Sequence, residues 1–488
     1  MKTAIVIGSG PGGLASSIRL ANKGYKVIVL EKNNYVGGKL TEIRLDKFRF
    51  DAGPSLFTMP ELVTELFELS SKNVADYFEY ERLSTICKYF YADGTIITAD
   101  SDVNKFAEEV EAKTTDSKEA VLKHLKQSEF IYNTTAELFL TKSLHKLSSY
   151  LNLSTFWSFF KFPFLNPLKT MDGVNSASFK DSKSQRLFNR YATYNGSNPY
   201  KAPAILNIIP HLEYNRGAYY PKGGMISISK SLHKLAVDLG VEFKLNCNVE
   251  KINVAKNRVT GVSFTGGSIN ADTVVSNADI KTVYDKLLPT KKALLKVQKQ
   301  ERSCSALIFY WGMNKKFSNL YVHNIFFTEN YKEEFKHLFG KADIYEDPTI
   351  YINITSKYSA DDAPKDCETW FVMINVPPDF SQDWDELIKE ARQSIITKLN
   401  RVLNIDIESL ILEEDMLTPQ LIESRTSSYR GSLYGTASND KFSAFFRHSN
   451  FSKTYKGLYF CGGSVHPGGG IPLALSSAKI IDKYIKHV

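Results

Sequence analysis

The chain has 488 residues, of which 43% are hydrophobic and 12% aromatic, and its formal net charge is +8. This length predicts two or three domains, and the scattered lysines, which form no block of like charge, argue against nucleic acid as a partner. No run reaches the ~18 consecutive apolar residues of a transmembrane helix, whereas the mild positive charge suits contact with an anionic membrane surface.

The first 31 residues predict a strand, a glycine-rich turn, a helix and a second strand that ends at an acid. Met1–Gly8 and Lys26–Leu30 are almost continuously apolar, as buried parallel strands are. Between them lies G-x-G-x-x-G, whose glycines permit a tight turn, the approach of a pyrophosphate and close packing of helix on strand. The acid stands where dinucleotide-binding proteins hold a ribose. The residues assigned to this dinucleotide site are Gly8, Gly10, Pro11, Gly12, Gly13 and Glu31.

Two more motifs follow the acid closely. One is a lysine-flanked glycine pair and the other is the sequence Phe-Asp-Ala-Gly-Pro-Ser at 50–55. Both are places where backbone can meet the middle of a long dinucleotide. The residues assigned to them are Lys32, Gly37, Gly38, Lys39, Gly53, Pro54 and Ser55.

The next region predicts a hairpin and then helices. Residues 86–98 form the hairpin, with Asp93-Gly94 as its turn, and residues 102–153 have a helical pattern rich in charge. The run 156–165 is strongly aromatic and is flanked by Lys161 and Lys169. Such a run either lies at a membrane interface or packs in a core, and the sequence leaves both alternatives open.

The middle of the chain predicts further strands and helices. Val249 is placed at the edge of the nucleotide site, on the strands of residues 241–262. The expected elements are a helix at 224–240, strands at 241–262, a parallel strand at 272–276, an antiparallel sheet within 303–376 and a helix at 384–402.

The C-terminal motif indicates FAD rather than NAD. Residues 457–472 run from an apolar strand through Gly462, Gly463 and a glycine triplet into a helix. The chain therefore returns to the nucleotide site, which suits an extended FAD held at several points and offers an NAD enzyme nothing obvious. The residues assigned to FAD here are Gly462, Gly463, Gly470, Ile471 and Pro472.

These motifs together resemble the bacterial-type carotenoid (phytoene) desaturases, within the wider group of FAD amine oxidases and Rab-escort-like proteins. The segments 217–225 (GAYYPKGGM) and 274–279 (VVSNAD) support the narrower group, and 194–213 looks closest to the hydroxycarotenoid 3,4-desaturase branch. Lys39 stands where the family more often has arginine, so a phosphate contact there should be weaker.

The resemblance implies an α/β fold in which a Rossmann-type FAD-binding domain is interleaved with a substrate domain of mixed antiparallel sheet and helices. The expected FAD-binding parts are residues 1–85, 222–300 and 440–488. The expected substrate-binding, helical and membrane-facing parts are residues 86–221 and 301–439.

The implied reaction is desaturation of a long apolar carotenoid by hydride transfer to flavin N5. This needs an apolar tunnel larger than ordinary pockets of ~300–1,000 Å³, and a base. His211 and Glu213 are candidates, since an extended segment would point both to one face, although Glu213 can instead pair with Arg216. His466, inside the C-terminal glycine turn, is a third candidate.

Several functions stay open. A phytoene desaturase, an amine-oxidase-like flavoenzyme and a non-catalytic prenyl-lipid escort share these motifs, and either quinone or oxygen would reoxidise the flavin. No metal-ligand spacing is present. The five widely spaced cysteines predict free buried thiols in a reducing compartment, and no signal peptide is evident. We therefore expect a cytoplasmic, peripherally membrane-associated protein.

Overall fold

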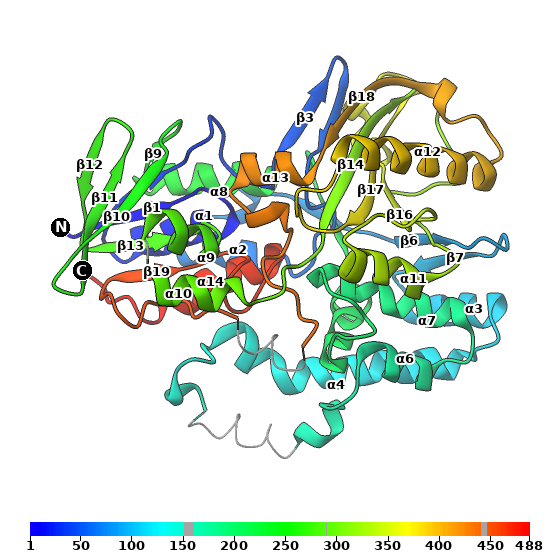
Figure 1. Ribbon diagram of the computed structural model, residues 1–488, viewed down its shortest axis with the longest axis horizontal. Helices are drawn as coiled ribbons and strands as arrows, with labels where there is room; N and C mark the ends of the chain where they lie inside the picture. The colour runs from blue at the N-terminus through cyan, green and yellow to red at the C-terminus, as the bar shows by residue number, and fades with distance from the viewer. Residues whose placement is uncertain (151–160, 289, 441–446) are drawn as a thin grey trace.

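A parallel sheet forms one half of the computed structural model, which describes residues 1–150, 161–288, 290–440 and 447–488. Its strand order is β19-β13-β1-β2-β9, so strands from both ends of the chain lie in one sheet (Figure 1). All of these pairings are parallel, as the sequence predicts for the strands at 1–8, 26–30 and 272–276. The strands are β1 (Thr3–Ile7), β2 (Lys26–Leu30), β9 (Glu242–Lys244), β13 (Thr273–Ser276) and β19 (Leu458–Phe460).

Both faces of this sheet are buried, because successive side chains along each strand point to opposite faces. Ala4 and Val6 point to a layer of helices, whereas Ile5 and Ile7 point to a small antiparallel sheet. The helices are α1 (Pro11–Asn22), α2 (Glu61–Leu69), α8 (Ile226–Asp238) and α14 (Ile471–Asp482). The antiparallel strands are β10 (Val249–Ala255), β11 (Arg258–Phe264) and β12 (Gly267–Asn270).

A mixed sheet dominates the other half, with the order β18-β14-β17-β16-β15-β6-β7. Its pairings are antiparallel except β15 with β6. The hairpin β6–β7 and the antiparallel strands within 303–376 confirm the prediction, but β15 is so short that its pattern gave no signal. The strands are β6 (Thr85–Phe90), β7 (Ile96–Asp100), β14 (Ser305–Met313), β15 (His323–Phe326), β16 (Ile350–Asn353), β17 (Glu368–Val376) and β18 (Ile411–Leu417).

Helices cover this sheet on both sides. Leu307 and Phe309 of β14 pack toward α12 (Trp384–Leu403), while the intervening Ala306 and Ile308 face the interior between the two halves. Below the sheet in Figure 1 lie helices of the expected region 102–153 and the residues after it. These are α3 (Val103–Lys113), α4 (Lys118–Thr141), α6 (Met171–Ser178) and α7 (Ser182–Asn189), with α11 (Tyr331–Lys336) beside them.

Short elements complete the fold. The extended conformation expected at 209–213 is wrong, because His211–Asn215 (η6) forms a π-helical turn. The remaining strands are β3 (Glu42–Leu45), β4 (Phe48–Asp51), β5 (Tyr80–Arg82) and β8 (Tyr219–Pro221), and the remaining helices include α9 (Ile280–Thr282), α10 (Lys291–Gln298) and α13 (Pro419–Thr426). The predicted domain boundaries stay a prediction.

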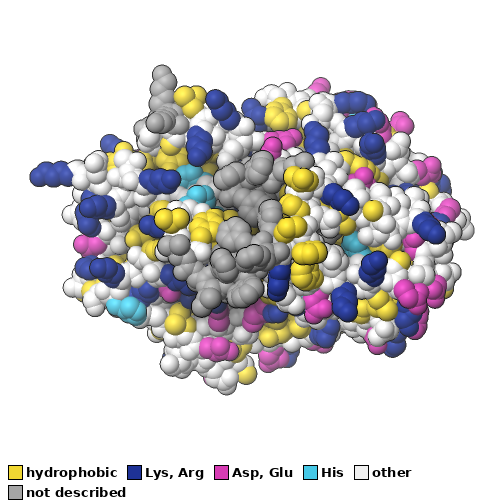
Figure 2. Space-filling view, turned by 90° about the horizontal axis from the view of Figure 1, so that it is seen from below, with side chains coloured by type: hydrophobic (Ala, Val, Ile, Leu, Met, Phe, Trp, Pro, Cys, Tyr) yellow, Lys and Arg dark blue, Asp and Glu magenta, His cyan; other side chains and the backbone are white. Residues whose placement is uncertain are grey.

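The face seen from below in Figure 2 carries hydrophobic side chains interspersed with lysines and arginines. Of the aromatic run 156–165, residues 156–160 lie outside the described residues. The described part ends in a turn, η3 (Phe162–Leu165), whose backbone accepts a hydrogen bond from Gln127 of α4, with 3.0 Å between Gln127 Nε2 and the Phe164 carbonyl oxygen. All five cysteines are free and buried, which confirms that prediction.

Candidate active site

One large cavity links the two halves of the molecule. Its volume is about 1150 Å³, above the ~300–1,000 Å³ of ordinary ligand pockets. It begins at the glycine turn after β1 and ends against the interior face of the mixed sheet. The cavity therefore offers one continuous space for a dinucleotide and a long apolar ligand.

The glycine turn is shaped to receive a phosphate. Gly8, Gly10, Pro11 and Gly12 line the cavity, and α1 begins just after Gly10, with its free N–H groups at that end. Gly13 does not line the cavity, and a Cβ there would lie 2.0 Å from the carbonyl oxygen of Gly8. The residues before Gly13 thus leave room for a ligand, whereas the absence of a side chain at Gly13 lets α1 pack closely against β1.

Glu31 lies buried at the edge of this turn and lines the cavity. Its Oε2 accepts hydrogen bonds from the backbone N–H and the hydroxyl of Ser9, both at 2.8 Å, and its Oε1 accepts one from the backbone N–H of Asn33 at 3.0 Å. The carboxylate is therefore held rigidly at the place where the sequence predicts a ribose.

We expect Glu31→Ala to weaken FAD binding by ~1.5–3 kcal/mol, the range for a hydrogen bond to a charged group. Titration of the stripped protein with FAD measures this change. Because Glu31 also holds Ser9, the variant Ser9→Ala is the matched control for loosening of the turn. An FAD dissociation constant that is the same in Glu31→Ala as in the wild type would assign the ribose to another residue.

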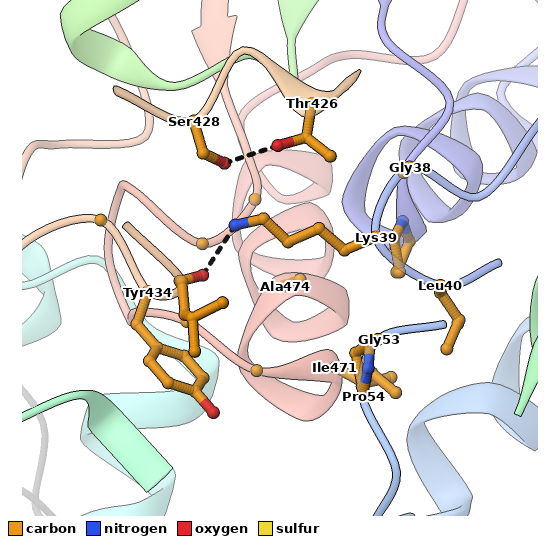
Figure 3. Close-up of a pocket in the computed structure, with 18 of the residues that line it drawn as sticks. Gly38, Lys39, Leu40, Gly53, Pro54, Thr426, Ser428, Tyr434, Ile471 and Ala474 are labelled. Carbon is orange, nitrogen blue, oxygen red and sulfur yellow. Dashed lines mark hydrogen bonds between the residues drawn. The ribbon is translucent and has the colours of Figure 1, made fainter. Parts of the chain in front are cut away.

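The lysine after the second glycine pair crosses the cavity. Lys39 Nζ donates hydrogen bonds to the carbonyl oxygens of Leu433 at 2.8 Å and Ser432 at 3.2 Å, and Figure 3 shows it extending toward that segment in front of α14. Burial lowers the pKa of Lys39 to about 8. The contacts of this lysine are therefore to backbone carbonyls of the C-terminal third of the chain.

Most of the remaining residues predicted to bind FAD lie around the same end of the cavity as the glycine turn. Gly37 is buried off the cavity, where a Cβ would lie 2.4 Å from the carbonyl oxygen of Leu40. Lys32 Nζ donates to the hydroxyl of Ser427 at 2.8 Å. The predicted residues that line the cavity here are Lys32, Gly38, Lys39, Gly53, Pro54, Ser55, Val249, Gly462, Gly463, Gly470, Ile471 and Pro472.

Asn277 joins the N-terminal and C-terminal motifs, and the sequence did not single it out as a site residue. A Cβ at Gly10 would lie 2.8 Å from Asn277 Nδ2, and one at Gly462 would lie 2.5 Å from Asn277 Oδ1. A Cβ at Gly12 would lie 2.7 Å from Asn277 Oδ1 and 3.0 Å from the backbone nitrogen of Gly462. The three segments meet around one amide, which lines the cavity.

The far end of the cavity is mostly apolar. Side chains from the interior face of the mixed sheet lie opposite side chains of residues 206–212. This surface suits a hydrocarbon chain, because apolar area removed from water drives binding. The apolar lining residues include Ala306, Ile308, Ile325, Phe371, Met373, Leu206, Ile208, Ile209 and Leu212.

A buried ion pair stands in this apolar end. Arg190 Nη2 and Glu213 Oε1 are 2.7 Å apart, and both residues line the cavity. Glu213 also accepts hydrogen bonds from the hydroxyls of Tyr191 at 2.9 Å and Tyr194 at 2.7 Å, and Arg190 donates to Tyr89. Although burial opposes its charge, attraction to Glu213 holds the pKa of Arg190 well above its ordinary value.

The predicted pairing of Glu213 with Arg216 is therefore wrong, because Glu213 pairs with Arg190 and Arg216 pairs with Glu61 of α2. The sequence missed the partner because Arg190 lies 23 residues before Glu213 and in no recognisable motif. Of the predicted base candidates, only Glu213 lines the cavity.

The two candidate histidines lie off the cavity. His211 packs its ring against Tyr132, with ring centroids 4.7 Å apart, and burial lowers its pKa. His466 is fully buried, and its Nε2 lies 3.0 Å from the carbonyl oxygen of Lys142. Burial lowers the pKa of His466 to about 4. Their roles as bases stay predictions.

Membrane spans and metal sites are absent from the part of the chain that the structure describes. None of its helices is long and apolar enough to cross a membrane. No group of three or more His, Cys, Asp and Glu side chains within those residues could hold a metal ion.

Comparison with known proteins agrees with this geometry. The family of flavin-containing amine oxidoreductases matches residues 11–480. A 1-hydroxycarotenoid 3,4-desaturase from Flavobacterium sp. (strain P99-3) is 54% identical over 98% of both chains. A phytoene desaturase from Fusarium fujikuroi is 30% identical over 99% of this chain and 89% of its own. The crystal structure of an oxidoreductase from Methanosarcina mazei shares the fold, with a TM-score of 0.63 and 14% identity over 98% of both chains.

Proposed function

This chain belongs to the carotenoid desaturases, which are FAD-dependent oxidoreductases of the flavin-containing amine oxidoreductase family, and we propose that it desaturates the 3,4 bond of a 1-hydroxycarotenoid. The observation that carries this proposal is the single cavity that joins an FAD end to an apolar end. The higher identity to the 3,4-desaturase than to the phytoene desaturase favours a hydroxylated substrate.

The residues divide the work between cofactor and substrate. FAD would be held by the glycine turn, Glu31 and the C-terminal glycines, and a bound flavin supplies a hydride acceptor at N5. The interior face of the mixed sheet would align the hydrocarbon chain and keep water from the reacting carbons. Two alternative functions have less support. A small polar amine would be a poor match for the apolar end of the cavity, so an amine oxidase is disfavoured. A non-catalytic prenyl-lipid escort would not need a complete dinucleotide-binding end.

Pigment analysis tests this function. Expression of the chain in a host that makes 1-hydroxycarotenoids is expected to convert them to products with one additional double bond, whose absorption lies at longer wavelength. The Gly10→Val variant serves as the inactive control. Unchanged 1-hydroxycarotenoid in this host, together with desaturation of phytoene in a second host that makes phytoene alone, would assign the chain to the phytoene desaturases instead.

We also propose that a quinone or oxygen takes the electrons from the reduced flavin. A desaturation leaves two electrons on the cofactor, which must leave before the next turnover. Anaerobic assays with and without added quinone separate the two acceptors. Turnover that persists anaerobically without quinone would require a third acceptor.

We propose further that the protein docks on a membrane through the surface around η3. The substrate dissolves in bilayers, and Phe164 and Leu168 expose 69% and 77% of their surface. Lys161 and Lys169 are exposed beside them. Apolar side chains flanked by cations are typical of interfacial segments, and anionic lipid adds attraction of about 1 kcal/mol per lysine near the surface.

We expect the double variant Phe164→Ser/Leu168→Ser to lose most of its binding to anionic liposomes in a flotation assay, while its flavin content and unfolding temperature stay at wild-type values. Leu412→Ser, an exposed apolar residue of β18 with 52% of its surface accessible, is the matched control and should bind normally. A folded double variant that still floats with liposomes would place the docking surface elsewhere.

A further inference from the structure

A row of hydrogen-bonded side chains leads from the flavin end of the cavity into the mixed sheet. Ser55 Oγ lies 2.7 Å from Tyr351 Oη, which lies 2.7 Å from His323 Nδ1. All three residues line the cavity. Ser55 follows Gly53-Pro54, the turn assigned to FAD, whereas His323 and Tyr351 are strand residues of the paired β15 and β16.

The direction of these hydrogen bonds follows from Asn353. Its Nδ2 donates to the carbonyl oxygen of Val322 at 2.9 Å and stands 3.2 Å from His323 Nδ1. An amide nitrogen only donates, so the His323 Nδ1 that faces it carries no proton, and the proton of the neutral ring is on Nε2. Burial lowers the pKa of His323 to about 3, which keeps the ring neutral.

The protons of the row therefore all point the same way. Tyr351 has one hydroxyl proton, which it donates to His323 Nδ1, so its oxygen accepts the proton of Ser55. With that proton committed, the Ser55 oxygen offers only lone pairs to a ligand. Ser55 is partly exposed, and the Tyr351 ring beside it packs on Phe371 with centroids 6.1 Å apart.

We propose that Ser55 accepts a hydrogen bond from the terminal hydroxyl of the substrate and thereby selects hydroxylated carotenoids. The inference rests on the proposed function, and it assigns to the Ser55 side chain a role separate from the backbone contact with FAD. In a 1-hydroxycarotenoid only one carbon atom separates the hydroxyl-bearing carbon from the 3,4 bond. A hydroxyl acceptor must therefore stand beside the flavin turn, which is where Ser55 lies.

Tyr351 and His323 act as positioning residues in this proposal. They fix the Ser55 proton away from the substrate, so that the serine cannot serve equally as a donor. If these hydrogen bonds had only a structural role, their loss would change stability but not which substrate the enzyme prefers. Substrate preference, rather than total activity, is therefore the informative readout.

The test compares a 1-hydroxycarotenoid with the same carotenoid lacking the hydroxyl. Both are presented in liposomes to the FAD-loaded protein, with kcat/KM and equilibrium binding, followed by the shift in carotenoid absorption, measured for each. The wild type should prefer the hydroxylated compound by a factor on the order of 10–100. Ser55→Ala should bring the ratio near one by lowering kcat/KM for the hydroxylated compound alone.

Three further variants complete the test. Ser55→Thr keeps a hydroxyl and should retain most of the preference, whereas Tyr351→Phe frees the serine proton and should reduce it partly. Thr58→Val, which removes another hydroxyl that lines the cavity, should leave the ratio unchanged. Because Ser55 also belongs to the residues assigned to FAD, flavin content is measured for every variant, and the preference ratios are compared at equal flavin occupancy.

The outcomes separate this inference from the proposed function. A wild type that binds both compounds equally, or a flavin-loaded Ser55→Ala protein that keeps the preference, would overturn the inference. Preferential binding of the hydroxylated compound without turnover would uphold the inference and overturn the proposed function instead.

Discussion

The Gly10→Val variant is expected to fold and to carry no FAD. The backbone at Gly10 is extended, with φ of −65° and ψ of 173°, which valine adopts readily. The nearest atom to an added Cβ is the amide nitrogen of Asn277 at 2.8 Å, at the end of a side chain that can turn aside. The added methyl groups would stand where the pyrophosphate approaches the backbone.

The ratio of flavin to protein absorbance after gel filtration measures this loss. Because a ligand bound only to the folded state raises its stability, Gly10→Val should unfold at the same temperature as wild-type protein stripped of FAD. Gly340→Val, whose Cβ meets no atom within 4 Å, is the control and should keep its flavin. A Gly10→Val protein with full flavin content would show that the phosphates bind elsewhere.

Breaking the Arg190–Glu213 pair is expected to destabilise the protein by about 3–5 kcal/mol. Glu213→Leu leaves the guanidinium of Arg190 buried without a countercharge, and Arg190→Met leaves the carboxylate in the same position. The double variant Arg190→Met/Glu213→Leu removes both charges and should recover most of the loss, because well-packed apolar residues often replace buried ion pairs at little cost. Chemical denaturation of the four proteins gives the coupling free energy.

The same double variant tests whether Glu213 is the base. If the pair only shapes the cavity, the double variant should regain turnover together with stability. If Glu213 accepts the proton, stability should return and turnover should not. Equal stability of all four proteins would contradict the structural importance of the pair.

The parts predicted from sequence are those in which adjacent residues determine the structure. The turn at Gly8–Gly13 and the strand Lys26–Leu30 were predicted because glycine spacing and continuous apolar runs are local signals. The hairpin was predicted because Asp93-Gly94 supplies its own turn, with Gly94 at a φ of +82°. Most motifs of the FAD end lie on such segments.

The missed parts depend on residues far apart in the chain. Lys39 reaches carbonyl oxygens 393 and 394 residues away, and Arg190 meets a tyrosine 101 residues before it. The row from Ser55 spans 296 residues in its first step alone. No periodicity or spacing reports such contacts, because tertiary packing creates them.

The parallel sheet has a consequence for how the protein is made. β1 and β2 are synthesised first, whereas β19 and α14, which pack beside β13 and α1, are synthesised last. At ~5–20 residues per second a ribosome takes roughly 20–90 s to travel from the end of α1 to the start of α14. During that time the nascent chain exposes the apolar faces that α14 later covers and has no complete place for FAD. Truncated products should therefore be colourless and dependent on chaperones, and the yellow colour of the flavin reports that synthesis has passed α14.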